Sequence, residues 1–211
     1  MSRVRWLGWA AIAILLGGCA TRPDYAAFFE HHPRSLLIVP AVNRTTAVDA
    51  PLVFASTVTA PFAERGYYVF PVVLTQEILT EVGASDEGLM AQMRPSQFRE
   101  IFGADAVLFV TIKRWSTLYL FLVSSVEVEF DYRLVDTATG VTLWERTQVV
   151  AEGNGGGHPL VMAITAALNA LMTDYRPLAH RANFLVVGQP GRGLPAGPYR
   201  SDFKADYGAY R

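Results

Sequence analysis

Two short runs of consecutive apolar residues stand out in the first half of the chain. They cover residues 35–40 and residues 106–112. Runs of this length without polar alternation are typical of strands that are buried on both faces of a sheet. We therefore expect residues 35–40 to form the central strand. Residues 67–72 read as a second strand, which Pro71 places at an edge or at a strand end.

Between these two runs, apolar residues recur at spacings of three and four, which is the helical period. The first such stripe predicts a helix in which Pro61 causes a kink or the end. Two further helices are expected over residues 74–82 and 95–102, with a polar loop over residues 84–94 between them. The first stripe consists of Leu52, Ala55, Val58 and Phe62.

Further along, the pattern changes to strict alternation over residues 126–134, which predicts an antiparallel strand with one buried and one solvated face. Residues 136–140 supply a turn, and residues 141–150 form the expected hairpin partner. The predicted fold class is therefore α/β with α+β character: a single mixed β-sheet with an antiparallel hairpin and helices packed on it. The charged positions of the alternation are interpreted as a solvated row and not as catalytic carboxylates: Glu127, Glu129, Asp131 and Arg133.

Two apolar segments lack a polar face. Residues 118–123, which include Tyr119 and Phe121, are either covered on both faces or form a patch for a partner or a membrane, and we favour burial. Residues 160–173 predict a helix without a charge, which is expected to be buried all round against the C-terminal segment or another subunit. Its side of small residues is a candidate partner contact: Ala163, Ala166 and Ala170.

The N-terminal residues show the three parts of a secretory signal: Arg3 and Arg5, an apolar run, and small residues before Cys19. The apolar run is too short to span a bilayer comfortably. Cys19 is the only cysteine of the chain, and the sequence from Leu16 to Cys19 resembles the lipobox of bacterial lipoproteins. That resemblance implies cleavage after Gly18 and a lipid on Cys19. A cleaved signal with an incidental cysteine and a retained transmembrane helix remain as alternatives.

The lipobox resemblance also implies the chemistry of the anchor. Cys19 would carry a diacylglycerol thioether and an N-acyl chain such as palmitate, and no other cofactor is expected. Several acyl chains hold a protein stably at a membrane, whereas one chain binds only marginally. Ala20 follows the cysteine where Asp would signal retention in the inner membrane, so the resemblance favours the outer membrane of the cell envelope.

Composition narrows the function classes. Loss of Arg3 and Arg5 with the signal takes the formal net charge from −1 to −3, and no basic patch indicates nucleic-acid binding. Paired histidines at positions 31 and 32 do not supply the three or four ligands of a metal site. The expected organisation is a signal peptide over residues 1–18, a lipidated tether over 19–34, a globular α/β domain over 35–175 and a Pro/Gly-rich, extended C-terminal arm over 176–211.

A glycine-rich loop precedes the charge-free helix and could bind an anion on its backbone amides. It lacks the Gly-Lys-Ser/Thr ending of a P-loop, so we interpret it as a flexible connector. A periplasmic ligand-binding or hydrolytic protein that uses residues 153–158 stays open as the alternative function. The candidate anion-binding residues are Gly155, Gly156, Gly157 and His158.

Five segments together resemble one family of bacterial lipoproteins of unknown function, which includes a neisserial vaccine-candidate antigen. These segments are residues 37–40, 64–71, 101–108, 134–140 and 194–199. More distantly, the pattern is similar to the amino-terminal domain of TolB and to the curli-secretion lipoprotein. The resemblance implies a compact α/β domain that binds envelope proteins or self-associates, and it offers no catalytic residues.

The sequence therefore predicts a non-enzymatic, lipid-anchored envelope protein. Its expected partners are the membrane, through the lipid, and other envelope proteins, as a homo-oligomer or a hetero-complex. An accessory role in an export or assembly system fits this prediction.

Overall fold

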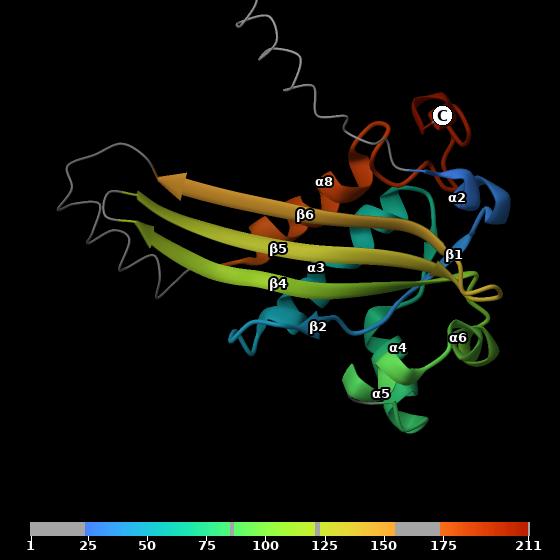
Figure 1. Cartoon of the computed structure of the whole chain (residues 1–211), viewed down its shortest axis with the longest axis horizontal. Helices are drawn as coiled ribbons and strands as arrows, with labels where there is room; N and C mark the ends of the chain where they lie inside the picture. The colour runs from blue at the N-terminus through green and yellow to red at the C-terminus, as the bar shows by residue number, and fades with distance from the viewer. Residues whose placement is uncertain (1–23, 85–86, 121–122, 155–173, 211) are drawn as a thin grey trace, which may run out of the picture.

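One six-stranded mixed sheet runs through the described part of the chain, which in this computed structural model comprises residues 24–84, 87–120, 123–154 and 174–210 (Figure 1). The strand order is β3-β1-β4-β5-β6, and the short β2 also pairs with β4. The strands are β1 Ser35–Ile38, β2 Val42–Asn43, β3 Tyr68–Val69, β4 Ala106–Leu120, β5 Val123–Asp136 and β6 Thr142–Asn154.

Strand β1 lies between two parallel neighbours, β3 and β4, as expected for the central strand. Strands β4, β5 and β6 form an antiparallel meander of long strands. The predicted fold class and the predicted hairpin are therefore confirmed. The alternation that predicted β5 is confirmed as well, because its apolar positions are fully buried: Val128, Phe130, Tyr132 and Leu134.

Helices cover the two faces of the sheet unequally. Helices α3 Ala50–Glu64 and α8 Arg176–Gly188 pack on one face beneath the long strands. On the other face, α4 Val72–Glu81, α5 Glu87–Gln92 and α6 Pro95–Phe102 lie near β1, as Figure 1 shows. None of the described helices covers most of the second face of β4, β5 and β6.

The two faces give two hydrophobic cores, and successive residues of β1 and of the position directly after it contribute to each in turn. Leu36 and Ile38 belong to the core under α3 and α8, while Leu37 and Val39 belong to the core under α4 and α6. All four side chains are at most 2% exposed. This burial on both faces explains why the run shows no polar alternation.

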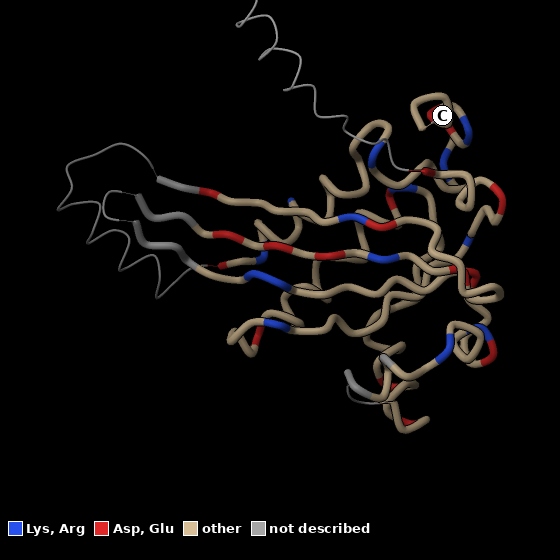
Figure 2. The backbone as a smooth tube through the Cα atoms, in the orientation of Figure 1, with Lys and Arg blue, Asp and Glu red and all other residues tan. Residues whose placement is uncertain are grey.

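The uncovered face carries the charged row of β5 (Figure 2). Arg114 of β4 pairs with Glu127 at 2.5 Å and with Glu129 at 3.1 Å, and Lys113 pairs with Asp131 at 3.1 Å. A register shift between Ile112 and Arg114 brings these two consecutive basic residues to the same acidic row. The pairs agree with the structural interpretation of the row.

Two details of the predicted helices differ in the structure. Pro61 does not end α3, which continues to Glu64, and Pro61 and Phe62 are both buried. Packing of this turn on the sheet outweighs the hydrogen bond that proline removes. Residues 84–94 are not only a polar loop, since they contain α5, whose Met90 is 5% exposed in the second core.

The expected tether is wrong for its second half. Residues Ala26–His31 form helix α2, and the side chains of Tyr25 and Phe28 are 3% and 1% exposed. The Tyr25 hydroxyl donates to the carbonyl oxygen of Gly193 at 2.7 Å. Aromatic burial therefore fixes this segment to the domain, although its sequence has no sustained period.

The expected extended character of the C-terminal arm is also wrong. Residues 176–188 form α8, and Leu194 and Ala196 are almost fully buried. The Gly197 amide donates to the Arg65 carbonyl at 2.8 Å, so the segment is tied to the end of α3. A Cβ on Gly197 would meet the carbonyl oxygen of Gly66 at 2.2 Å. Gly197 is therefore needed because it lets two backbone segments pack closely, and not because it makes the chain flexible.

Candidate binding site at the carboxyl end of strand β1

The carboxyl end of β1 is the topological switch point of the sheet. The chain leaves β1 toward β3 on one side and returns to β4 on the other side. In open α/β sheets, ligands bind in the crevice outside such a strand end. Here two hollows share Val39 and Pro40, which directly follow β1.

The first, which we call the aliphatic hollow, lies between α3 and α4 and has a volume of about 220 Å³. Val48, Pro51 and Leu52 line its α3 side, and Val72 lines its α4 side. Val48 is 93% exposed and Leu52 is 75% exposed, and the neighbouring Val73 is 73% exposed. Apart from Gln76 the lining of this hollow is apolar, and it holds no charged side chain, so the hollow suits an apolar group.

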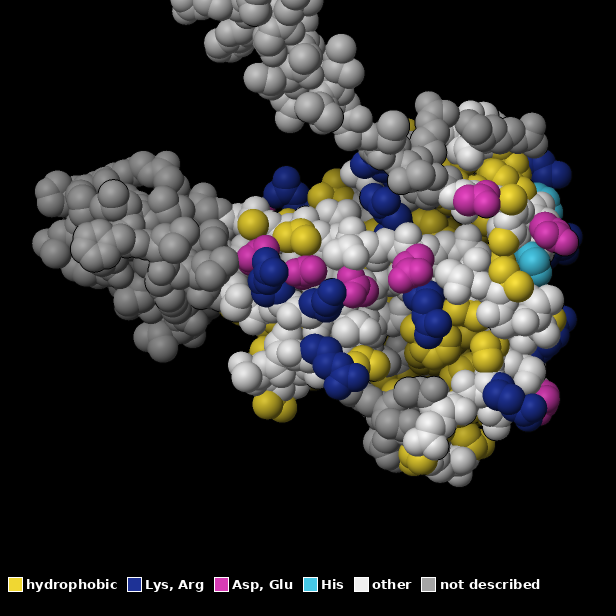
Figure 3. Space-filling view, in the orientation of Figure 1, with side chains coloured by type: hydrophobic (Ala, Val, Ile, Leu, Met, Phe, Trp, Pro, Cys, Tyr) yellow, Lys and Arg dark blue, Asp and Glu magenta, His cyan; other side chains and the backbone are white. Residues whose placement is uncertain are grey.

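The second, which we call the methionine groove, has a volume of about 430 Å³, within the range of small-molecule and peptide pockets. Met90 and Met93 form one wall, and Phe109 and Val135 contribute from the sheet. The charged rim of the groove consists of Asp131, Arg133 and Glu145. Hydrophobic side chains are exposed beside the charged row in Figure 3.

Arg133 joins the charged rim to the apolar part of the groove. Its guanidinium carbon lies 5.2 Å from the centre of the Phe109 ring, a cation–π arrangement. Asp131 is occupied by Lys113 and by the Thr147 hydroxyl, which donates to it at 2.6 Å. The groove therefore offers one cation and adaptable thioethers to a bound group.

The chemistry of the two hollows is set by apolar side chains and a few charged rim residues. In the described residues, no group of three or more His, Cys, Asp or Glu side chains is placed to hold a metal ion. Burial raises the pKa of Tyr132 well above its usual value, but its hydroxyl donates to Asn183 Oδ1 at 2.7 Å inside the core. The two hollows can bind and orient apolar groups of another molecule, as protein-binding sites do.

Most site residues predicted from the sequence lie outside the described part of the chain. This is so for Gly18, Cys19, Gly155, Gly156, Gly157, His158, Phe121, Ala163, Ala166 and Ala170. Tyr119 lies in β4, where its backbone pairs with Ser124 of β5. These assignments stay predictions.

Sequence reasoning missed both hollows. Leu52 belonged to the predicted core stripe of α3, yet only Val58 and Phe62 of that stripe are fully buried. The available signal was the position of Val48 and Leu52 shortly after a central parallel strand, where a switch point forms. None of the described helices is both long and apolar enough to cross a membrane.

Comparison with known proteins gives consistent matches over most of the chain. Residues 23–198 match a family model described as "Putative lipoprotein GNA1162-like". The lipoprotein NMB1124/NMB1162 of Neisseria meningitidis serogroup B is 34% identical over 203 residues, which cover 91% of this chain and 94% of the relative. The crystal structure of lipoprotein GNA1162 from Neisseria meningitidis is similar with a TM-score of 0.55 and 33% identity, covering 67% of this chain and 100% of that chain.

Proposed function

The chain belongs to the family of GNA1162-like lipoproteins, and from this premise we propose that it is a non-enzymatic adaptor of the cell envelope. In this proposal Cys19 carries the lipid anchor, and the outer membrane is its site because Ala20 follows the cysteine. The folded domain binds a segment of another envelope protein at the carboxyl end of β1.

One observation carries the proposal: two large aliphatic side chains that line an apolar hollow are exposed to solvent. Val48 and Leu52 are 93% and 75% exposed, whereas Val58 of the same lining is fully buried. Burying one such side chain completely contributes about 1.5 to 3 kcal/mol. Clustered exposed aliphatics with a concave surface between them are typical of interaction sites.

The two hollows define the chemistry of the partner segment. An apolar side chain of the partner fits the aliphatic hollow, because no charged group lines it. The methionine groove accepts a second apolar group, and Met90 and Met93 can adjust to its shape. Arg133 and Glu145 on the rim can pair with polar groups of the segment and so fix its direction.

The non-enzymatic part of the proposal is supported by the ion pairs that the charged residues of β5 form with basic residues of β4. The acidic residues of β5 pair with Lys113 and Arg114, and Glu127 and Glu129 are held at 11% and 15% side-chain exposure by Arg114. These carboxylates therefore neutralise neighbouring bases. The alternative of binding or hydrolysis at residues 153–158 falls largely on residues outside the described part of the chain, and no observation favours it.

The test compares two substitutions of leucine on helix surfaces. Leu52→Asp places a charge in the aliphatic hollow, whereas Leu185→Asp changes a 41% exposed leucine of α8 away from it. Crosslinking in intact cells, followed by purification of the full chain, gives the amount of captured partner. We expect Leu52→Asp to reduce the partner about tenfold or more and Leu185→Asp to leave it unchanged.

One outcome of this crosslinking experiment would exclude the aliphatic hollow as the binding site. If Leu52→Asp retains the partner at the level of the unchanged protein, while urea unfolding shows both variants to be folded, the aliphatic hollow is not the binding site. The mass of the crosslinked product distinguishes a different protein from a second copy of this chain.

A further inference from the structure

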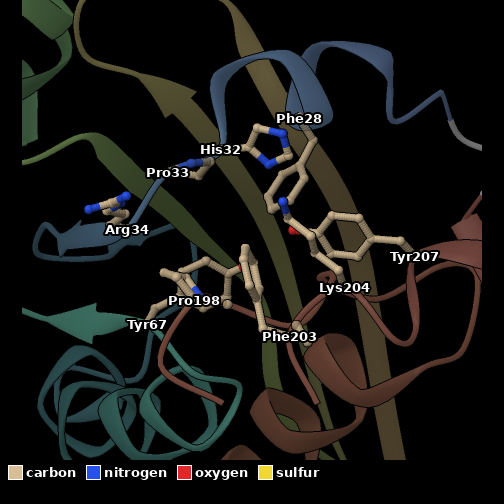
Figure 4. A pocket seen from close by; sticks show the side chains of 11 residues that line it. Phe28, His32, Pro33, Arg34, Tyr67, Pro198, Phe203, Lys204 and Tyr207 are labelled. Atoms are coloured by element: carbon tan, nitrogen blue, oxygen red, sulfur yellow. The ribbon is translucent and has the colours of Figure 1, made fainter. Parts of the chain in front are cut away.

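A separate pocket of about 200 Å³ lies where α2 meets the C-terminal segment (Figure 4). His32 and Arg34 line it from the N-terminal side and Lys204 from the C-terminal side. In Figure 4 the Lys204 side chain reaches toward the His32 ring. The aromatic walls of the pocket are Phe28, Tyr67, Phe203 and Tyr207.

The charge of this pocket is one-sided: its lining contains three basic residues and no acidic residue. The nearby carboxylates are engaged by other groups. Asp206 pairs with Arg65, and Asp202 pairs with Arg200 at 2.6 Å. Asp105 accepts from the backbone amide of Arg34 at 3.0 Å and forms no ion pair with its guanidinium. Among the described residues, no carboxylate forms an ion pair with Arg34 or Lys204. The pocket therefore has positive charge available for a ligand.

Two residues of this pocket have a left-handed backbone conformation. His32 and Lys204 have φ values of 45° and 69°, and they are the non-glycine residues with positive φ in the described part of the chain. At His32 this conformation is the C-cap that ends α2, and it sets the position of the His32 ring at the pocket. Burial lowers the pKa of His32, and the charge of Lys204 lowers it further.

The position along the chain brings this pocket near the proposed anchor. Tyr25 is six residues after Cys19, a separation of at most about 22 Å even for a fully extended chain. The Tyr25 ring lies 6.3 Å from that of Phe29, which lies 4.7 Å from that of Tyr207 in the pocket wall. With Cys19 in the membrane, the pocket is within reach of the lipid headgroups.

We propose that His32, Arg34 and Lys204 bind a phosphate group, presented by a phospholipid headgroup or as free phosphate. Arg and Lys are the side chains that pair most favourably with phosphate oxygens. The aromatic walls then contact the carbon atoms that a headgroup carries beside its phosphate. This site is distinct from the hollows at β1, and its existence does not depend on the proposed function.

The two lysines of the chain allow a direct test with an internal control. Lys204 lies in the pocket, and Lys113 lies on the open face of the sheet, paired with Asp131. The full lipoprotein in phosphate-free dodecyl maltoside micelles is treated with an amine-acylating reagent, and peptide mass spectrometry gives the rate at each lysine. One arm adds inorganic phosphate and a second adds phosphatidylglycerol to the micelles. Diacylglycerol and an equal ionic strength of chloride serve as controls.

We expect acylation of Lys204 to slow about tenfold at a tenfold excess over the dissociation constant, while Lys113 changes little. Protection by phosphatidylglycerol alone identifies the lipid headgroup as the source, and protection by inorganic phosphate alone identifies free phosphate. Arg34→Gln should weaken binding about tenfold, and Arg44→Gln, at another exposed arginine, should not. Absence of protection in both arms, or equal protection of Lys113 or by chloride, overturns the proposal.

Discussion

Arg65, just after α3, forms an ion pair with Asp206, which lies 141 residues later near the end of the chain. Its guanidinium also donates to the Leu194 carbonyl at 2.5 Å and to the Tyr210 hydroxyl at 2.9 Å. One largely buried side chain thus holds the C-terminal segment on the domain, at 12% exposure for Arg65 and 24% for Asp206.

Replacing this arginine should therefore destabilise the fold. Arg65→Ala removes the ion pair and leaves the partly buried Asp206 carboxylate without a cation, although the Ala196 amide still donates to it. The Leu194 carbonyl keeps only the longer bond from the Tyr210 hydroxyl at 3.3 Å. The substitution should cost about 2 to 3 kcal/mol in the free energy of unfolding. Arg181→Ala removes an exposed pair with Glu152 and should cost less than about 1 kcal/mol. Urea unfolding measures both values. Equal costs would contradict the role of Arg65.

Backbone packing at Gly197 makes a second prediction. A methyl group there would collide with the Gly66 carbonyl, so Gly197→Ala should destabilise the protein by about 1 to 3 kcal/mol and expose the C-terminal segment to proteases. Gly208 has nothing within 4 Å of an added Cβ, and Gly208→Ala serves as the control. Thermal unfolding and limited proteolysis check the pair. Similar behaviour of the two variants would refute close packing at Gly197.

Stability should fall steeply at alkaline pH. Burial raises the pKa of Tyr67 and Tyr132 well above the usual value near 10, so these phenols stay protonated in the folded protein. The unfolded chain ionises them near pH 10 and then binds fewer protons. Stability is thus complete below about pH 10 and declines above it, by up to about 1.4 kcal/mol per pH unit for each tyrosine.

Two phenylalanine variants test this pH dependence. Tyr67→Phe should reduce the slope of unfolding free energy against pH above 10, although it also loses the hydrogen bond to the Pro195 carbonyl. Tyr199→Phe, at a 68% exposed tyrosine, should leave the slope unchanged. Urea unfolding at pH 9, 10 and 11 gives the slopes, and an unaltered slope in Tyr67→Phe would show that its ionisation is not linked to folding.

The anchor is tested by Cys19→Ala. The substitution removes the only thiol, so incorporation of a fatty-acid probe into the protein should be abolished. Labelling of cells and mass spectrometry of the purified chain measure the modification. Undiminished incorporation of the fatty-acid probe into Cys19→Ala would show that Cys19 is not the lipid-bearing residue.

The hydrophobic pattern of the sequence was sufficient to predict the strands at the centre of the sheet. The apolar run of β1 and the alternation of β5 report burial directly, because each strand residue faces one layer or the other. Helices α3, α4 and α6 followed from their periodicity. These strands and helices pack on one another, and the hydrophobic pattern of the sequence predicts each of them.

The termini and the site could not be obtained in this way. Tyr25 and Phe28 are buried by the C-terminal segment, and Gly197 packs on Gly66 at a distance that composition cannot reveal. Periodicity also cannot tell that Leu52 projects beyond the sheet at the start of α3. The hollows are lined by residues from several helices and strands that meet only in the folded chain.

The most direct measurement of the central claim is site-specific photo-crosslinking in living cells. A photoreactive amino acid replaces Leu52 in the aliphatic hollow or Leu185 on α8, and the full lipoprotein is then purified and sized. We expect one discrete protein adduct from position 52 and none of that mass from position 185. Equal adducts at the two positions, or no adduct at position 52, would contradict binding of a partner protein at the aliphatic hollow.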